Sequence, residues 1–395
     1  MPFRLTNIVL LFVVTTIAQG EGADYLSRLQ AVVSHWHEDL PALRISARKA
    51  AQSLIEQGGG LYLGGNQTSF IDEADGRAGG LAGLKRLNPN IVLRSSDVVL
   101  ISVASSGSGD TLHQQFAQIE SAGATAIVFG PDPAPHRQNS GYFPSAGSDN
   151  PPNLQSVNNV AGLWIWVGEF VSASRRLGKM PCFYESVGIP GGADRNKTIA
   201  GQLFHSGFVT PEAATSLGEA YLITLQKALT ELRARNDAAL HRATSLLRNT
   251  HVAGKEASLL AIGHMFPAEF QNAVLPTWIH PVEGSSPALE SLVVFLGYQA
   301  FPWDNPTLTG HLRRPAIIIS SQGPSSDWPE DSDHIYLDPC WDIHDACVSC
   351  PGYDIPILPL SGVITCALFW HLMESLNPTI TSPTQVASKH DLPQS

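Results

Sequence analysis

The stretch Asp97-Val-Val-Leu-Ile-Ser-Val-Ala-Ser-Ser-Gly-Ser-Gly-Asp-Thr111 decides the fold that we predict for this chain. Its apolar first half, Asp97 to Val103, predicts a buried strand, and a helix is expected to begin at Asp110. The serines and glycines between them place hydroxyls and free backbone N–H groups at the N-terminus of this helix. The helix dipole and these donors together favour an anion, most naturally a phosphate. The alternative is an ordinary serine-rich capped loop that follows a strand.

Two glycine-rich turns supply the residues of the predicted anion site. The turn just quoted offers Ser106, Ser108, Gly109 and Thr111. An earlier turn, Gly64-Gly-Asn-Gln-Thr-Ser69, follows a short predicted strand, and it offers Asn66, Thr68 and Ser69. Glycine lets the backbone approach a ligand closely, and hydroxyl groups add hydrogen-bond donors. We therefore expect these residues to bind the substrate or its phosphate.

Strands alternate with helices in both halves of the chain. The predicted strands lie at 61–63, 97–103, 124–130, 257–262, 292–296, 315–320 and 335–337. The predicted helices lie at 24–57 with an interruption at Pro41, and at 69–84, 110–119, 160–178, 211–248 and 362–376, with an irregular loop at 131–152. This alternation, at similar spacing in each half, predicts two parallel sheets related by duplication. Ligands of such sheets bind at the carboxyl ends of the strands, where the glycine turns lie.

The order of these parts resembles the sugar isomerase (SIS) fold, the phosphosugar-binding module of phosphoheptose isomerases and of the isomerase half of glucosamine-6-phosphate synthase. The family's phosphate loop, Ser-x-Ser-Gly-Glu/Asp-Thr, is similar to Ser106-Gly-Ser-Gly-Asp-Thr111, and its following strand to Ala122-Gly-Ala-Thr-Ala-Ile127. Its first glycine turn resembles Gly65-Asn-Gln-Thr-Ser69, and its closing segment resembles Pro356-Ile-Leu-Pro-Leu-Ser-Gly-Val363. The resemblance covers most of residues 24–380 and favours a phosphosugar-type site at the quoted loop.

The resemblance implies an α/β fold class, with two tandem SIS-type three-layer α/β/α modules whose parallel sheets have a flavodoxin-like topology. We expect a signal peptide at 1–20, a module with the phosphate loop at 21–200, a degenerate module at 201–380 and a disordered tail at 381–395. The second half has Leu296-Gly-Tyr-Gln-Ala-Phe-Pro302 where a phosphate loop would lie, so one anion site per chain is expected. Modules of this family commonly associate, which implies a homo-oligomer, either a dimer or a tetramer.

An aldose–ketose isomerase moves a proton between two carbons through an enediol, and it needs a base of suitable pKa. The isomerases that the chain resembles use a glutamate, and no glutamate here has a matching context. Glu73, on the helix after the first glycine turn, is the best-placed catalytic candidate. Its neighbours Asp72 and Asp75 could raise its pKa, but a solvated acidic face is the interpretation that we favour.

Four other charged residues are weaker candidates. His264, at the end of a second-half strand, could reach the first site across the interface as a catalytic group, although a hydrogen-bonded structural histidine is the commoner outcome. Arg77 and Lys179 could neutralise a phosphate or be plain surface charges. Glu185 lies beside a glycine-rich stretch, with no motif behind it.

Composition and the N-terminus limit the partners and the location. The net charge of −11 and the low content of charged residues, 15%, argue against nucleic acid and against anionic membrane surfaces. Arg4 precedes an apolar run from Ile8 to Ala18, and Ala18-Gln-Gly20 offers small residues for cleavage, the pattern of a signal peptide. This run is shorter than the ~20 residues that span a bilayer, so we expect an exported chain without a transmembrane span. The alternative is an uncleaved anchor.

Five cysteines are present, an odd number that leaves at least one thiol free. Cys340, Cys347 and Cys350, with His344 nearby, could bind zinc, form a disulfide or stay as buried thiols. Because a second Cys-x-x-Cys pair is missing, we expect no metal, and no motif calls for a cofactor. The sequence also lacks a Gly-x-Ser-x-Gly elbow, a Walker loop and His-Glu-x-x-His.

The function that the sequence favours is binding of a phosphosugar or another small carbohydrate derivative by an exported protein, with aldose–ketose isomerisation as a further activity. The alternative is a non-catalytic binding or sensing protein that has lost the base. A purely structural scaffold is disfavoured, because the loop keeps its hydroxyls.

Overall fold

The computed structural model describes residues 24–104, 110–130, 140–143, 150–211, 216–271, 273–282, 291–298, 315–323 and 333–376. The predicted signal peptide, the predicted tail and the loop residues Ser106, Ser108 and Gly109 lie outside these ranges.

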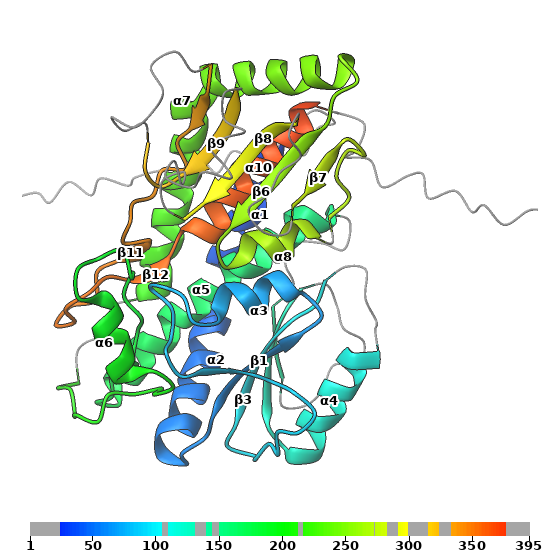
Figure 1. The fold of residues 1–395 in the computed structure, drawn as a ribbon. Helices are drawn as coiled ribbons and strands as arrows, with labels where there is room; N and C mark the ends of the chain where they lie inside the picture. Colours follow the sequence, from blue (N-terminus) through cyan, green and yellow to red (C-terminus); the bar gives the residue numbers. More distant parts are fainter. Residues whose placement is uncertain are drawn as a thin grey trace, which may run out of the picture.

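The first half contains one parallel sheet of five strands in the order β2-β1-β3-β4-β5 (Figure 1). The strands are β1 (Leu61–Gly65), β2 (Leu84–Arg86), β3 (Val98–Ser102), β4 (Thr125–Phe129) and β5 (Ser140–Phe143). Leu61 pairs with Leu84 on one side and with Val98 on the other. Every residue of β1 and β3 is buried, as is typical of a parallel sheet covered on both faces.

The second half contains a matching sheet in the order β10-β9-β8-β6-β7. The strands are β6 (Ala257–Ile262), β7 (Ile279–Pro281), β8 (Leu292–Gly297), β9 (Ala316–Ser320) and β10 (Ile335–Leu337). All their pairings are parallel. Counted from the first strand of each half, both sheets have the flavodoxin-like order 2-1-3-4-5. The predicted fold class, with one parallel sheet in each half, is therefore confirmed.

Helices form the outer layers and a shared centre. They are α1 (Tyr25–Ser34), α2 (Trp36–Glu56), α3 (Thr68–Ala74), α4 (Asp110–Ala122), α5 (Pro152–Arg176), α6 (Gly192–Ile199), α7 (Leu217–Val252), α8 (Met265–Gln271) and α10 (Ser361–Leu376). Val99 and Ile101 of β3 pack with Leu112 of α4 on one face of the first sheet. Val98 and Leu100 belong to the larger core, which includes α2 and α5 on the other face. This alternation produces the three-layer arrangement.

The two halves share one hydrophobic core. Helix α5 is buried almost from end to end, and it packs against α2, α7 and α10. Where α5 crosses α7, a Cβ on Gly168 would lie 2.5 Å from the backbone nitrogen of Gly218, so a side chain at this crossing has no space. Helix α1, the first described helix, packs against α7 and against α10, the last described helix. Figure 1 shows the two sheets one above the other, with α3 and α8 where the halves meet.

Several expected elements are wrong in detail. The N-terminal helical region breaks at His35, between α1 and α2, whereas α2 continues through Pro41. The expected helix over 69–84 ends at Ala74, because Gly76 and Gly79 adopt positive φ angles, and β2 then begins at Leu84. The loop expected at 131–152 contains β5.

The short elements α6, α8 and β7 were not predicted, nor was the antiparallel pair β11 (Ala346–Val348) and β12 (Ile357–Pro359). In the part of the chain that the structure describes, no helix has the length and apolar character needed to cross a membrane.

Candidate functional site

The carboxyl ends of β1 and β3 meet in a tight crossing formed by the first glycine turn. Gly65 has a φ of 113°, and a Cβ there would lie 2.0 Å from the carbonyl oxygen of Ser102. The next residue, Asn66, donates its backbone N–H to the same carbonyl at 3.1 Å. A residue with a side chain fits neither the φ angle nor the space at position 65, so this turn requires glycine.

Two hydrogen bonds tie this turn to both ends of the segment that contains the predicted anion loop. The backbone N–H of Ala104, at the end of β3, donates to Oδ1 of Asn66 at 2.7 Å. The backbone N–H of Gly65 donates to Oε1 of Gln115, in the second turn of α4, also at 2.7 Å. The first glycine turn thus contacts both the end of β3 and the second turn of α4.

A buried network of amides and hydroxyls lies behind the turn. Oε1 of Gln67 accepts hydrogen bonds from Ser102 Oγ at 2.5 Å and from Asn159 Nδ2 at 3.0 Å. Asn159, on α5, also reaches the backbone oxygen of Val103 at 3.3 Å. Nε2 of Gln67 donates to Ser69 Oγ at 3.1 Å. These bonds fix the strand ends against α5 and position Ser69 at the start of α3.

Glu269 of the second half completes this network. Its carboxylate accepts hydrogen bonds from Ser69 Oγ at 2.8 Å, from Ser156 Oγ and from Trp370 Nε1 at 3.3 Å. The side chain is 8% exposed, and no ion pair to it occurs among the described residues. Burial raises the pKa of Glu269 above its usual value, although the three hydrogen bonds oppose this effect. A carboxylate with a raised pKa beside a polar turn is the type of group that acid–base chemistry uses.

The sequence interpretation missed Glu269. The repeated plan of the two halves could have identified it, because α8 follows β6 as α3 follows β1. The two helices face each other, so a polar residue on α8 reaches the beginning of α3.

Glu73 occupies a different place, in a fully buried ionic cluster at the junction of the two halves. It pairs with Arg77, four residues later, and Arg77 also pairs with Asp345. Trp164 Nε1 donates to Glu73 at 3.4 Å, and a Cβ on Gly362 would collide with the carboxylate. The solvated acidic face that we favoured is therefore wrong for Glu73, whose side chain is 0% exposed.

Only the neighbours of Glu73 are acidic surface residues. Asp72 and Asp75 are partly exposed and pair with Arg86. Arg77 is buried between two carboxylates, so it is not the surface charge that one alternative assumed. The catalytic role considered for Glu73 remains a prediction, but its burial and its partners give it a structural role.

Within the cluster, two carboxylates share one guanidinium, and Glu73 is the better place for a proton. Asp345 accepts hydrogen bonds from the backbone N–H of Ser361 at 2.8 Å and from Ser361 Oγ at 3.0 Å, in addition to its Arg77 pair. Glu73 Oε2, in contrast, is buried without a hydrogen-bond partner among the described residues. Burial raises the pKa of Glu73 to about 7, with Arg77 lowering it and Asp345 raising it. A protonated Glu73 leaves the buried cluster electrically neutral.

His264 reaches the first half across the interface, but at the cluster rather than at the glycine turn. Burial and the charge of Arg77 lower the pKa of its ring to about 4, while a hydrogen bond to the backbone of Asp75 raises it. The ring is therefore neutral at physiological pH. This arrangement is that of the hydrogen-bonded structural histidine, and a catalytic role for His264 remains a prediction.

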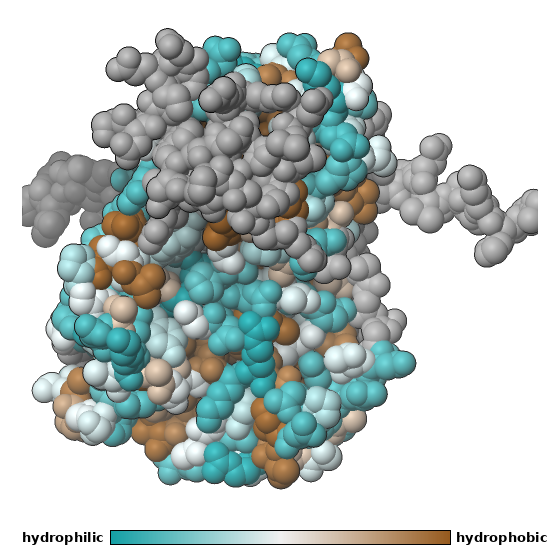
Figure 2. All heavy atoms as spheres, in the orientation of Figure 1, coloured by the Kyte–Doolittle hydropathy of each residue, from teal (hydrophilic) through white to brown (hydrophobic). Residues whose placement is uncertain are grey.

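Two further predicted binding residues that the structure describes lie at the surface. Thr68 and Thr111 are exposed at the starts of α3 and α4. Thr111 lines a groove of about 210 Å³ together with three glutamines of α4 and the Asn88-Pro89 turn. On the face shown in Figure 2, hydrophilic side chains cover much of the lower half, in front of β1 and β3, with hydrophobic ones in small groups between them.

The cysteines do not support a metal centre. All five are free thiols, so the disulfide considered among Cys340, Cys347 and Cys350 is absent. Within the described ranges, no group of three or more histidine, cysteine, aspartate or glutamate residues is arranged to bind a metal ion.

This chain is similar to known proteins in its fold but not in its sequence. No family model matches the chain, and no curated protein matches it. Among solved structures, the C-terminal domain of glucosamine-fructose-6-phosphate aminotransferase from Francisella tularensis is 10% identical, with a TM-score of 0.46 over 91% of this chain and 97% of that one.

Two further structures are similar to the same degree. A proposed sugar binding protein from Salmonella typhimurium LT2 is 11% identical, with a TM-score of 0.45 over 89% of this chain and 98% of that one. A proposed tagatose-6-phosphate ketose/aldose isomerase from Clostridium novyi NT is 9% identical, with a TM-score of 0.47 over 90% and 89%. Proteins of the kind that the sequence motifs resemble are thus among the similar structures.

The cluster predicts a pH dependence of stability. Because folding raises the pKa of Glu73 from 4.5 to about 7, the folded chain holds a proton that the unfolded chain releases in this range. The free energy of unfolding should therefore fall as the pH rises from about 4.5 to 7, and the Glu73→Gln variant should lack this part of the slope. Urea unfolding of both proteins at several pH values measures the difference. Asp72→Asn, at the exposed neighbour, is the control that should keep the wild-type slope, and equal slopes in all three proteins would refute the proton assignment.

Proposed function

We propose that the chain is a SIS-type protein that binds a small sugar derivative with an anionic group, preferably a phosphate, at the carboxyl edge of the first sheet. The observation that carries this proposal is the pair of hydrogen bonds from Ala104 to Asn66 and from Gly65 to Gln115. They hold the first glycine turn against Ala104, at the end of β3, and against Gln115, in the second turn of α4, two residues that flank the Ser-x-Ser-Gly-Asp-Thr segment in the sequence. This contact supports a site to which both glycine-rich turns contribute.

The chemistry of the described residues supports this ligand class. Helix α4 has 13 residues, and the first N–H groups of such a helix, with its dipole, favour an anion. Asn66 follows β1, and Thr68 and Thr111 lie at the starts of α3 and α4, so their carboxamide and hydroxyl groups can match the hydroxyls of a sugar. The net charge of −11 disfavours polyanionic partners such as nucleic acid.

The binding proposal predicts a thermal shift. Glucose 6-phosphate, fructose 6-phosphate and glucosamine 6-phosphate in excess should raise the melting temperature, because a ligand that binds only the folded state stabilises it by RT ln(1 + [L]/Kd). The unphosphorylated sugars should have a smaller effect. In the Ser108→Ala/Thr111→Ala variant, the shift should disappear.

Ser245→Ala/Thr198→Ala removes two exposed hydroxyls elsewhere and serves as the matched control. A shift that persists in the loop variant, or no shift with any phosphosugar, would contradict the proposed site.

A second candidate function is aldose–ketose isomerisation at the same place, and Glu269 is the observation that favours it. The carboxylate is hydrogen-bonded to Ser69 of the first glycine turn and has a raised pKa. A carboxylate in this setting can accept a proton from a sugar carbon and return it to the neighbouring carbon. The alternative, a binding protein without turnover, would use Glu269 only to hold the turn.

The Glu269→Gln variant distinguishes isomerisation from binding without turnover. If Glu269 is the base, the variant should keep the thermal shift but lose interconversion of glucose 6-phosphate and fructose 6-phosphate about 10²- to 10⁴-fold. The variant should also no longer incorporate deuterium from the solvent into the sugar, which NMR measures. Glu38→Gln, at an exposed glutamate outside the network, is the control that should keep both the shift and any turnover. Binding without turnover in the wild-type chain would favour the binding protein instead.

The proposal has two further parts. The chain is exported, and it forms a dimer or a tetramer. These parts rest on the signal-peptide pattern of residues 1–20 and on the resemblance to modules that associate. N-terminal sequencing of the chain from the medium of expressing cells should find a start after Gly20. An intact N-terminus retained with the cells would refute export.

A further inference from the structure

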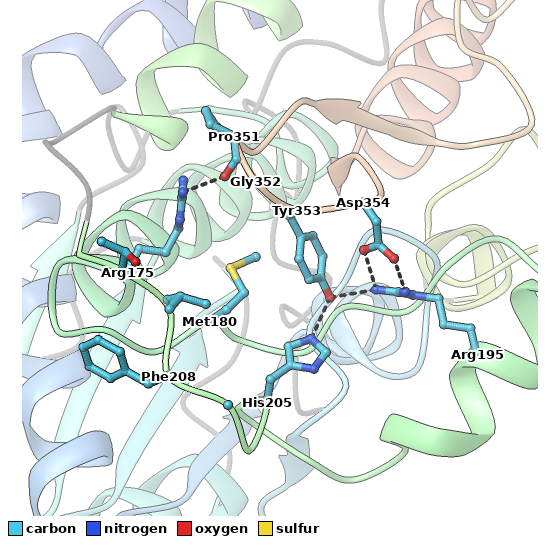
Figure 3. Close-up of a pocket in the computed structure, with 12 residues that line it drawn as sticks. Arg175, Met180, Arg195, His205, Phe208, Pro351, Gly352, Tyr353 and Asp354 are labelled. Carbon is cyan, nitrogen blue, oxygen red and sulfur yellow. Dashed lines mark hydrogen bonds and ion pairs between the residues drawn. The ribbon is translucent and has the colours of Figure 1, made fainter.

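A pocket of about 450 Å³ lies at the C-terminal end of α5, between residues 178–210 and the turn at 350–354 (Figure 3). Its volume is within the range of small-molecule sites. It is separate from the candidate sugar site, because the two lie at opposite ends of α5. Ser156 contacts Glu269 near the start of this helix, and Arg175 lines the pocket near its end. At 1.5 Å per residue, the two positions are ~28 Å apart.

The hydrogen bonds at the back of the pocket fix the protonation of His205. The hydroxyl oxygen of Tyr353 accepts hydrogen bonds from Arg195 Nη2 at 3.1 Å and from the backbone N–H of Phe183 at 3.3 Å. Both acceptor sites of the phenol are then used, so its own hydrogen must be donated to His205 Nε2, 3.0 Å away. His205 is therefore neutral and carries its hydrogen on Nδ1. Burial and the charge of Arg195 lower the pKa of His205, which favours this state.

Arg195 places a positive charge at the pocket. Its two terminal nitrogens bind the carboxylate of Asp354, and its guanidinium lies over the ring of Tyr353, 5.4 Å from the centroid. Nε of Arg195 is buried without a hydrogen-bond partner in the described part of the chain. Because Asp354 is mostly exposed, its ion pair with Arg195 contributes little to the stability of the fold. Because Nε is buried, a ligand carboxylate would meet the terminal nitrogens of Arg195 instead, in place of the exposed carboxylate of Asp354.

The opposite wall of the pocket is apolar. Met180 is buried, whereas the ring of Phe208 is 72% exposed at the pocket. The ring covers Gly178 so closely that a Cβ there would lie 2.0 Å from it. Val209 and Pro351 extend this wall. An aromatic ring left in water at the edge of a cavity gains free energy when a flat apolar group covers it.

We propose that this pocket is a second binding site, and that it takes a small organic acid with an aromatic body. The carboxylate lies toward Arg195 and the Nδ1–H of His205, and the ring packs between Phe208 and Met180. Guanidinium groups bind carboxylates in a planar, two-bond geometry, which makes the acid a better ligand than its neutral analogue. The site joins the two halves of the chain, because Met180 and Arg195 precede the expected module boundary after residue 200, whereas Tyr353 lies in the turn before β12.

Calorimetric titration with indole-3-acetate and with benzoate tests the proposal. The wild-type chain should bind both acids, and the matched amides, indole-3-acetamide and benzamide, should bind at least tenfold more weakly. Phe208→Ala and Arg195→Gln should each weaken acid binding about tenfold or more. Val274→Ala and Arg235→Gln, which alter an exposed apolar residue and an exposed paired arginine outside the pocket, should leave it unchanged.

Two further results keep the test decisive. Phe208 is largely exposed, so its alanine variant should keep the wild-type melting temperature, and its loss of binding then reports on the pocket rather than on folding. The Ser108→Ala/Thr111→Ala variant should bind the acids normally, which distinguishes this site from the proposed sugar site. Absence of acid binding, equal binding of acids and amides, or binding that survives in Phe208→Ala and Arg195→Gln would each overturn the proposal.

Discussion

The contact between α3 and α8 is the constraint on which the rest of the structure depends. Across it, a carboxylate of the second half, Glu269, accepts hydrogen bonds from Ser69 and Ser156 of the first half. On the other side of α3, Arg77 of the first half pairs with Asp345 of the second. Separating the halves would leave these buried polar groups without partners, at a cost of several kcal/mol for an unpaired charge. The junction therefore holds the glycine turn in one position.

The strands and their order were predictable because burial on both faces makes each central strand a continuous apolar run, as in Val98 to Ile101. Elements such as β7 and α6 were not predicted, because β7 has one buried residue and α6 is mostly polar, so neither forms an apolar run or a periodic pattern. Asn66 and Ser69 were predicted as site residues because they lie in a glycine-rich turn, which is recognisable in the sequence, and their role in binding stays a prediction. Glu269 was not predicted, because its hydrogen-bond partners Ser69 and Ser156 lie far from it in the sequence.

The environment of Glu73 also could not be predicted from its sequence neighbours. Its sequence neighbours, Asp72 and Asp75, are indeed at the surface, and they indicated a solvated face. Its real environment is set by Asp345 and Gly362, almost 300 residues later, and by desolvation, which no local pattern reports. Helix α5 has a comparable role on a larger scale. It is buried along its length, and it separates the polar network at one end from the aromatic and cationic pocket at the other.

The central claim is that a sugar derivative binds where the first glycine turn meets the start of α4. Amide hydrogen exchange with and without saturating glucosamine 6-phosphate tests it most directly, because ligand contact and ordering slow exchange locally. The account predicts slower exchange at residues 65–69 and 104–112, and unchanged exchange at the far end of α5 and in the 350–354 turn. Slower exchange confined to other segments, with no change in either glycine-rich turn, would contradict it.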